Sequence, residues 1–451
     1  MLHFDAYHIS PIALRCTKGI IANFAWMRRL VSPVESTSLV AGGRHFLERG
    51  EGWCMAETKR CIYCSEAKSS DEFSQEHIIP QFMGGTSDCA AAVTRDACQK
   101  CNSLFGRFVD GPVARGYFLR SIEQGSWAAC FDFNENAGNV YPLTYFGKSR
   151  EIRFGEDEEV EVWLCPDGGT AWHVHAKHPE DFNALAGGDP VLRRKDESSR
   201  VYSFIASEHP YWALSNLKSV QAHFTQEPIF LGTDSDIEAQ LDRARQKGKF
   251  CQKDSAALGE RNRIRALLDE RRPLDHLIQM DLLFDVRFLA KLAIAFGFKS
   301  LGDEFGNLRY TAMLRNLLWT RRANLDAIQH QVRMKHYFAG LQDYSFKHIS
   351  FPHGFVFLVK AFKEGLILGI VFPSGHYAQV SITDSTIDAE AEALVRNVED
   401  YVLVSIPQLR RTLGPIQLPR FISWKLGSHK ITELDDIVGR LTDRAAMPPL
   451  R

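Results

Sequence analysis

Two Cys-x-x-Cys pairs enclose an acid–histidine dipeptide near the start of this sequence. The first pair is Cys61 and Cys64, and the second is Cys98 and Cys101. Cysteines three residues apart on a tight turn direct two sulfur atoms to one point, and two such turns complete a tetrahedron. The spacing therefore predicts a structural Zn²⁺ site, in preference to four unrelated buried cysteines or to redox pairs, which would need a strand–helix–strand context.

Three polar residues lie within or beside this cysteine frame. Glu76 precedes His77, and Asn102 directly follows the last cysteine. Closure of the zinc site brings these side chains towards one another. A carboxylate and an amide oxygen are hard ligands that suit Mg²⁺ or Mn²⁺, and a neutral imidazole beside such an ion can take a proton from water. The set therefore suits attack by hydroxide on a phosphodiester.

The ordered motifs Cys-x-x-Cys, Glu-His-Ile-Ile-Pro, Gly-Gly, Cys-x-x-Cys-Asn, Phe-Gly-Arg and Asp-Gly-Pro cover residues 59–115. This pattern resembles the HNH, or ββα-metal, endonucleases in their zinc-ribbon-supported form. The resemblance implies a metal-dependent nuclease that cuts nucleic acid, with DNA as the expected substrate. It makes His77 the general base, and it makes Glu76 and Asn102 ligands of a catalytic Mg²⁺ or Mn²⁺.

One position departs from the family pattern. Val93 stands where the family usually has an asparagine that orients the catalytic histidine, so Thr94 or a backbone carbonyl would have to orient it. Nearby, Arg107 could contact phosphate and Asp110 could support the site, although a solvated helix end and a turn explain both equally well. The departure leaves an alternative function open: a catalytically inactive zinc-ribbon module that binds nucleic acid or protein.

The elements that would position these residues follow from local patterns. Residues 72–80 read as a strand and turn that Pro80 ends, Gly84 and Gly85 form a second turn, and a helix begins near the second cysteine pair. We therefore predict two short strands followed by a helix. The fold class is α+β: a small zinc-bound ββα-metal module, followed by a mixed antiparallel-sheet and helical region.

The whole chain is divided into four parts. Residues 1–54 are expected to be an N-terminal extension without a role in the chemistry, or upstream sequence if Met55 is the true start; few acids also allow a transit peptide, which we disfavour. Residues 57–120 form the module, 125–233 a β-rich region, and 234–451 a mainly helical region with a late strand pair. In that last part we predict a buried helix over 282–296 and a long final helix over 390–404. The parts after the module are expected to set target or control.

Composition narrows the classes of protein. The chain has 45% apolar and 24% charged residues, which is typical of a soluble globular protein, and its net charge of -1 excludes a uniformly basic coat for nucleic acid. No apolar run reaches the roughly 18 residues needed to span a bilayer, so we expect no membrane partner. Ten cysteines in 451 residues are too few for a disulfide scaffold, which indicates a reducing, cytoplasmic compartment.

A histidine pair stands outside the module. His173 and His175 lie two residues apart on one face of a predicted strand that follows a Gly168-Gly169 turn. This spacing can bind a metal ion, but no third ligand is evident in the neighbouring sequence. We therefore interpret both as surface histidines.

Overall fold

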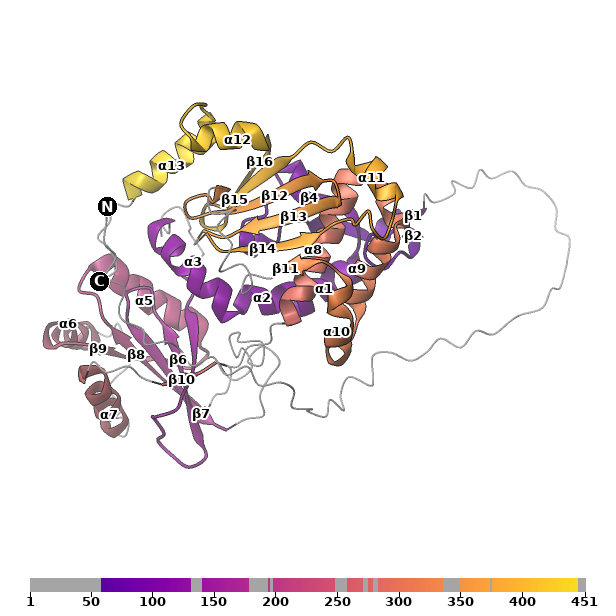
Figure 1. Cartoon of the computed structure of the whole chain (residues 1–451). Coiled ribbons are helices and arrows are strands. Elements are labelled where there is room, and N and C mark those ends of the chain that lie inside the picture. Colours follow the sequence, from indigo (N-terminus) through magenta and orange to yellow (C-terminus); the bar gives the residue numbers. More distant parts are fainter. Residues whose placement is uncertain are drawn as a thin grey trace, which may run out of the picture.

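The protein is α+β, as predicted, in a computed structural model that describes residues 58–130, 140–177, 194, 198–247, 258–270, 275–278, 283–335, 349–373 and 375–444. Residues 1–54, whose interpretation the sequence left open, lie outside these ranges. Two six-stranded sheets carry most of the strands, and each is covered by helices. Two short hairpins and one helix form a smaller unit that carries the four clustered cysteines (Figure 1).

This smaller unit, which we call the cysteine module (residues 58–118), has the predicted order of two short strands and a helix. Antiparallel strands β3 and β4 precede helix α1, and another short hairpin, β1–β2, comes first. A turn of π-helix, Gly106–Asp110, leads from α1 into the helices that follow. The bounds are β1 Thr58–Arg60, β2 Ala67–Ser69, β3 Phe73–His77, β4 Val93–Cys98, α1 Gln99–Phe105, α2 Gly111–Arg115 and α3 Tyr117–Cys130.

Position 84, in the predicted glycine turn, must be a glycine because the turn lies directly against residues 405–407. Its φ of 91° lies in the left-handed region. A Cβ atom at this position would lie 2.6 Å from Ser405 Oγ and 2.8 Å from the backbone nitrogen of Pro407. The turn therefore packs directly against the C-terminal sheet, and a side chain would force the two apart.

The second unit is a six-stranded sheet in the order β10-β5-β6-β7-β8-β9. All pairs are antiparallel except β8 and β9, which run parallel because helix α5 connects them as a crossover. The antiparallel sheet predicted in this region is confirmed. The bounds are β5 Thr144–Ser149, β6 Glu158–Leu164, β7 Thr170–Ala176, β8 Arg200–Ile205, α5 Pro210–His223, β9 Ile229–Gly232, α6 Ser235–Gln246, α7 Leu258–Asp269 and β10 His276–Leu277.

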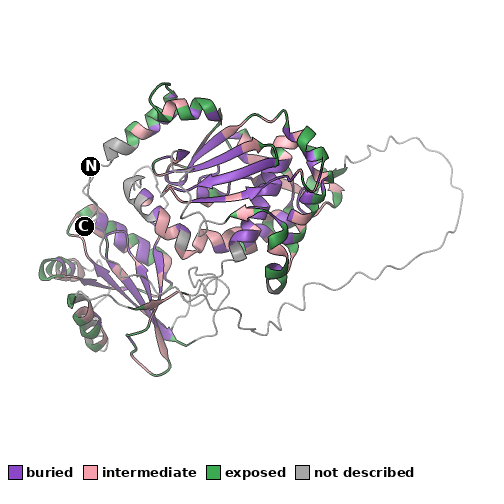
Figure 2. Ribbon diagram, viewed as in Figure 1, coloured by how far each residue is buried: buried purple, intermediate pink, exposed green. Residues whose placement is uncertain are grey.

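Both faces of this second sheet are buried (Figure 2). One face packs against α5 and α6 through Trp163, Val220 and Ile237, and the other packs against α7 through Ile264. Strand β7 is accordingly buried along almost its whole length. A polar side chain on this strand therefore lies in the protein interior, whichever face it occupies.

The third unit is a second six-stranded sheet, in the order β11-β14-β13-β12-β15-β16. The late strand pair that the sequence predicted is present as β12 and β13, and four further strands that it did not predict complete the sheet. The long helix predicted over 390–404 ends early: α11 covers Glu390–Val395, and β15 follows as Tyr401–Ile406. The other strands are β11 Met334–Lys335, β12 Phe355–Phe362, β13 Gly365–Val371, β14 Tyr377–Ser381 and β16 Arg411–Gln417.

Pairing with a distant strand explains why residues 401–406 form strand β15 and not the end of the predicted helix. Val404 lies opposite Val356 of β12, and Val402 lies opposite Leu358. The apolar residues of 401–406 can bury themselves as helix or strand, and a neighbouring edge with matching β-branched side chains decides for strand. The sequence of residues 390–406 does not indicate that strand β12 lies beside it.

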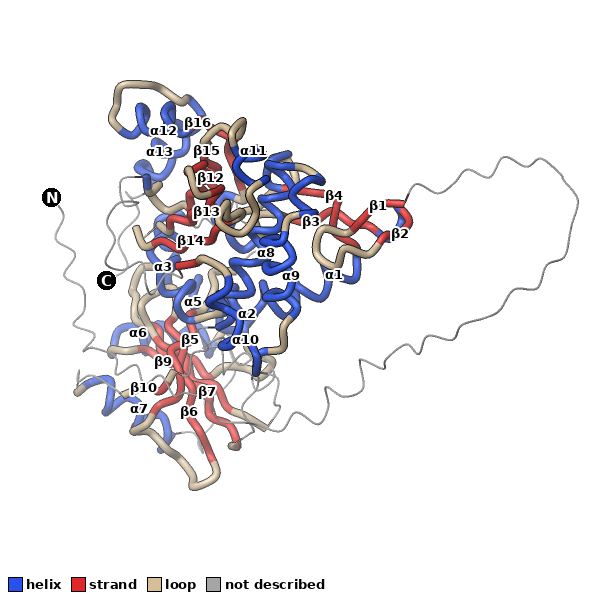
Figure 3. The backbone as a smooth tube through the Cα atoms, turned by 45° about the vertical axis from the view of Figure 1, so that its right-hand side comes forward, coloured by secondary structure: helices blue, strands red, loops and turns tan. Residues whose placement is uncertain are grey.

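Helix α8, Leu283–Leu301, lies between the third sheet and the cysteine module (Figure 3). The buried helix predicted over 282–296 is thus confirmed, and α9 (Arg309–Trp319) and α10 (Arg322–Ile328) follow it. One continuous hydrophobic core runs from the module through α8 to the sheet; it includes Ile79, Phe105, Leu292, Phe296, Phe357 and Leu368. The module therefore does not have a core of its own, and the predicted boundary at residue 120 does not separate two cores.

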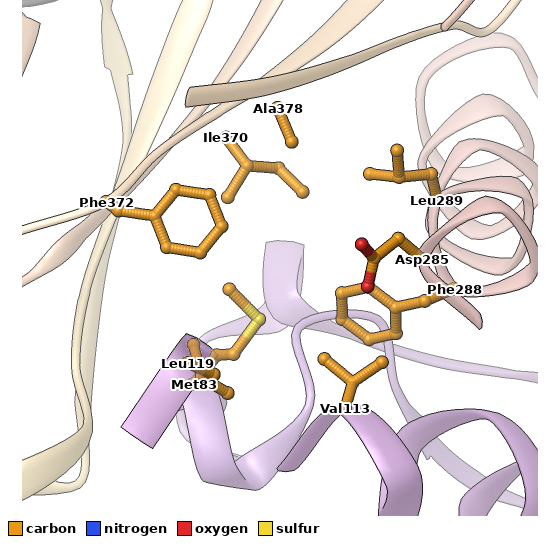
Figure 4. A pocket seen from close by; sticks show the side chains of 9 residues that line it. All are labelled: Met83, Val113, Leu119, Asp285, Phe288, Leu289, Ile370, Phe372 and Ala378. Atoms are coloured by element: carbon orange, nitrogen blue, oxygen red, sulfur yellow. The ribbon is translucent and has the colours of Figure 1, made fainter. Parts of the chain in front are cut away.

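The opposite face of the third sheet is covered by α12, Leu418–Lys425, and α13, Thr432–Arg444 (Figure 1). Where the module meets α8 and the sheet, a cavity of about 20 Å³ remains, lined by Met83, Val113, Leu119, Asp285, Phe288, Leu289, Ile370, Phe372 and Ala378 (Figure 4). It can hold roughly one water molecule, so the junction is packed and offers no room for a ligand. None of the helices in the described ranges has the length and apolar character that crossing a membrane requires.

Candidate active site and metal centre

The four predicted zinc ligands converge. Cys61 and Cys64 lie on the turn between β1 and β2, Cys98 ends β4, and Cys101 lies in the first turn of α1. Their sulfur atoms all lie within 4.8 Å of one another, and three of the four residues are buried. The set therefore fits one tetrahedral ion such as Zn²⁺, whose sulfur ligands are about 2.3 Å from the metal.

Local hydrogen bonds favour the metal-binding form of Cys61. The thiol of Cys101, together with the backbone N–H of Cys98, lowers the pKa of Cys61 to about 4. The Cys98 amide donates to Cys61 Sγ at 3.3 Å. The thiolate is the form that binds metals, and Cys61 is the member of the cluster whose surroundings favour it, since the same contact raises the pKa of Cys101.

Glu76 and His77 are neighbours in β3, and strand geometry points them to opposite faces. Glu76 lies opposite Thr94 in β4, and His77 lies opposite Val93. Glu76 is buried, whereas His77 is partly exposed. The two side chains therefore have different surroundings, although the sequence predicted that they would act together.

The Glu76 carboxylate takes part in a buried ion-pair cluster with the distant helix α8. Lys291 Nζ lies 2.8 Å from Glu76 Oε1 and 2.5 Å from Asp110 Oδ2. The hydroxyl of Tyr63 also donates to Glu76 Oε1, at 3.2 Å. Burial opposes the charge on Lys291, but the carboxylates of Asp110 and Glu76 outweigh it and raise the pKa of the ammonium group. A positively charged ammonium group therefore contacts Oε1 of Glu76, the residue that the sequence predicts to bind a metal ion.

The role of Glu76 as a ligand of the catalytic ion stays a prediction, since Lys291 and Tyr63 both contact the same carboxylate oxygen, Oε1. In the described part of the chain, three or more His, Cys, Asp or Glu side chains converge at two places: the four cysteines, and Glu161 with His173 and His175. Glu76 and His77 belong to neither group. Lys291 was missed because nothing in its sequence surroundings distinguishes it from other lysines on a helix, apart from its place on an otherwise apolar face.

His77 keeps the properties of a general base. Its Nε2 lies 3.4 Å from the hydroxyl of Ser87, which also accepts a hydrogen bond of 2.7 Å from Gln75 Nε2. Burial, and then the positive charge of Lys291, lower the pKa of His77 below the usual 6.5. The ring is consequently neutral at pH 7, which is the form that can accept a proton.

Asn102 joins α1 to β3. Its amide nitrogen donates to Ser74 Oγ at 3.0 Å and to the backbone carbonyl of Gln75 at 2.9 Å. Both contacts use the nitrogen, so the amide oxygen is the atom that a hard cation would meet. Asn102 therefore fits the predicted role of metal ligand better than Glu76 does.

Thr94 does not orient His77, which was one of the two predicted possibilities. Its hydroxyl is hydrogen bonded to the carboxylate of Asp96, two residues along the same strand, on the face of the hairpin opposite to His77. The carbonyl of Val93 accepts a hydrogen bond of 3.3 Å from Lys299 Nζ. Ser87 is the hydroxyl that lies beside the His77 ring, and no spacing rule indicated it.

Two further predicted residues have clear surroundings. Asp110 supports the site through Lys291, as a member of the same ion-pair cluster. Arg107 lies on an exposed turn with its guanidinium over the Phe108 ring, 5.1 Å from the centroid. Arg107 is thus positioned at the surface, where it can meet a nucleic-acid backbone.

The motif order, the β3–β4–α1 arrangement and the four-cysteine cluster belong together in one known family. Residues 61–118 match the family model described as HNH endonuclease. The predicted resemblance is confirmed for this span, and we refer to the cysteine module from here on as the HNH module. Comparison with curated proteins and with solved structures gave no match.

The histidine pair outside the HNH module was misinterpreted. His173 and His175 are not surface residues, since their exposed fractions are 0% and 1%. A third candidate ligand, Glu161, lies opposite His173 on β6. The Gly168-Gly169 turn carried the missing signal: a tight hairpin centred near that turn places residues 161 and 173 opposite each other.

Proposed function

We propose that this protein is a metal-dependent endonuclease that hydrolyses phosphodiester bonds in DNA, with His77 as the general base. The family of residues 61–118 supports nuclease activity on nucleic acid. The observation that carries the proposal is the state of His77: a neutral, partly exposed imidazole at the end of β3, in the position that the motif gives to the base.

The proposed reaction uses His77 to activate water. A ring nitrogen without a proton accepts one from water, and the resulting hydroxide attacks phosphorus while the bond to the leaving oxygen breaks. The leaving oxygen takes a proton from solvent, and His77 then releases its own proton to solvent. We expect removal of this base to lower the rate about 10²- to 10⁴-fold. Ser87 and the β3–β4 hairpin hold the ring in place during this step.

Mg²⁺ or Mn²⁺ is part of the proposal, with Asn102 as the protein ligand that fits. Such an ion, when bound, would stabilise the charge that develops on the phosphate. Glu76 is the other proposed ligand, through a carboxylate that Lys291 contacts at Oε1. We further propose that the four cysteines hold structural Zn²⁺ and that the protein works in a reducing cytoplasm, where these thiols stay available to the metal.

Residues after the HNH module are proposed to control it. Several side chains from helices α8 and α9 contact the module. Among them, Lys291 pairs with Glu76, Arg315 Nε donates to the Ile62 carbonyl at 2.9 Å, and Trp319 Nε1 donates to the Tyr63 carbonyl at 3.0 Å. Any movement of these helices would change the charge next to His77. This proposal extends the prediction that the C-terminal region sets target or control.

A plasmid-nicking assay tests the nuclease proposal. Purified full-length protein is incubated with supercoiled plasmid and Mg²⁺ or Mn²⁺, with EDTA in a parallel reaction. We expect cutting by the wild type, loss of cutting in His77→Ala and in EDTA, and full cutting by the control His330→Ala, which removes an exposed histidine outside the HNH module.

The outcomes separate the proposal from its alternative. Equal cutting by the wild type and His77→Ala would remove His77 from the mechanism. The second candidate function is a binding module without cleavage, favoured by the Lys291–Glu76 ion pair and by Val93 in place of the family asparagine. Retention of plasmid in a gel-shift assay, without cutting under any metal condition, would support that candidate instead.

A further inference from the structure

Three metal-ligating side chains meet in the interior of the second sheet, outside the HNH module. Glu161 of β6 lies opposite His173 of β7, and His175 lies two residues further along the same face. Their exposed fractions are 0%, 0% and 1%. One ligand atom from each residue lies within 4.8 Å of the other two. The triad is therefore fully enclosed between the sheet and the helices that cover it.

In each of the three side chains, the polar atom that points away from the other two lies within hydrogen-bond distance of a neighbouring residue. His173 Nε2 lies 2.7 Å from Ser199 Oγ, His175 Nδ1 lies 2.6 Å from the carbonyl oxygen of Ala176, and Glu161 Oε1 accepts a hydrogen bond of 3.0 Å from the Tyr145 hydroxyl. These contacts direct His173 Nδ1, His175 Nε2 and Glu161 Oε2 towards a common point. Such outer contacts are what fix the ring orientation of histidines that bind metals.

The distances at that point fit an ion better than direct hydrogen bonds. Glu161 Oε2 lies 3.4 Å from His175 Nε2 and 3.9 Å from His173 Nδ1. Hydrogen bonds between nitrogen and oxygen are typically about 2.7–3.2 Å long. Ligands placed about 2.1 Å from a tetrahedral Zn²⁺ are about 3.4 Å apart, which matches the closer of the two distances.

The chemistry at His175 leads to the same conclusion. The Ala176 carbonyl can only accept, so His175 Nδ1 carries the hydrogen in that contact. Nε2 is then the ring atom that faces the Glu161 carboxylate, at 3.4 Å. A cation between the two would offset the cost of burying the carboxylate.

We propose that Glu161, His173 and His175 bind a Zn²⁺ ion that links β6 to β7. Two imidazoles and one carboxylate are a ligand set that Zn²⁺ accepts, with water in the fourth position. Full burial of the three side chains gives the ion a structural role. The site does not depend on the proposed nuclease activity, because none of its residues belongs to the HNH module.

Zinc content measured by mass spectrometry tests the site. All proteins are full-length, carry His77→Ala together with Asn102→Ala so that the HNH site adds no ion, and are saturated with Zn²⁺ and then dialysed. We expect two equivalents per chain in this background and one after Glu161→Gln, which keeps the shape of the side chain and its contact with Tyr145. The matched control His276→Ala, a half-buried histidine of the same sheet, should keep two equivalents.

Two results would overturn the proposal: one equivalent in the background with His77→Ala and Asn102→Ala, or no loss on Glu161→Gln. If Glu161→Gln does not fold, loading the protein with His77→Ala and Asn102→Ala with Co²⁺ decides the question. Thiolate ligands give Co²⁺ a sulfur-to-metal charge-transfer absorption, and nitrogen and oxygen ligands do not. The proposal requires this absorption to saturate at one equivalent while a second Co²⁺ binds; saturation of all binding at one equivalent rejects it.

Discussion

The protonation state of His77 is set by its immediate neighbours. Partial burial disfavours the imidazolium, and the ammonium group of Lys291 adds a repulsive charge. Both effects act in the same direction and keep the ring neutral. A histidine of ordinary pKa would be partly protonated near neutral pH, and a base that is already protonated cannot accept a proton from water.

The pH dependence of cleavage should report this shift. The neutral ring is the active form, so activity should be lost as the pH falls through the pKa of His77. Because that pKa is lowered, the midpoint of the acid limb should lie below 6.5. Initial nicking rates between pH 4.5 and about 8.5, under constant metal concentration, measure it. An acid limb centred above 6.5 would contradict the assignment of His77 or the effect of its surroundings.

At the scale of elements, the cysteine cluster of the HNH module connects the β1–β2 turn to the end of β4 and the start of α1. Cys98 ends β4 and Cys101 lies one turn into α1, so the second pair joins a strand to a helix. The first pair lies on the β1–β2 turn, where the Cys61 carbonyl accepts a hydrogen bond of 2.9 Å from the Ser65 amide. The short elements bury little surface by themselves, so an ion is needed to keep them in place.

Cys101→Ser should therefore release the structural metal and unfold β4 and α1. Hydrogen exchange measured by mass spectrometry should show faster exchange across Cys98–Phe105, with metal content lower by one equivalent. Exchange should also rise in α9, since Trp319 contacts both the Tyr63 carbonyl and the Phe105 ring.

Cys89→Ser is the matched control for this prediction. Cys89 is a buried thiol of the same module, outside the cluster, that donates to the Gly414 carbonyl at 3.6 Å. Serine keeps the donor, so metal content and exchange should stay close to those of the wild type. A Cys101→Ser protein with normal exchange and no metal would show that the module does not need the ion.

For the whole molecule, the HNH module and the C-terminal sheet share one hydrophobic core with α8 between them. Lys291 extends from α8, and its ammonium group forms ion pairs with Glu76 and Asp110 of the module. Removing one partner of a buried ion pair typically costs about 3–5 kcal/mol, because the remaining charge is left uncompensated. The cluster thus couples the state of the active site to the stability of the entire unit.

Lys291→Met should lower the free energy of unfolding by about 3–5 kcal/mol. It should also raise the pKa of His77 towards its usual value, because one of the two causes of the shift is removed. Denaturant unfolding followed by circular dichroism measures the first effect, and the acid limb of the nicking rate measures the second.

Lys299→Met provides the comparison, since Lys299 is an exposed lysine on the same helix. Its substitution should change the stability by about 0.5 kcal/mol or less and leave the acid limb unmoved. Equal effects of the two substitutions would show that the buried cluster has no special role.

Local spacing was enough to predict the four-cysteine cluster and the order of elements in the HNH module. The two cysteine pairs, the strand–strand–helix order and His77 all depend on contacts within about forty residues, where turns and strand periodicity restrict the chain strongly. The buried helix α8 also followed from its own apolar pattern. The family match at residues 61–118 agrees with this local frame.

Only the tertiary structure decided which polar groups meet across long distances in the sequence. The ion pair between Glu76 and Lys291, which lies on a helix far along the chain, could not be predicted from either local sequence. His173 and His175 were read as surface residues because the helices that cover the second sheet are not visible in a strand pattern. Burial and charge pairing depend on the neighbours that folding supplies, and one sequence segment does not contain them.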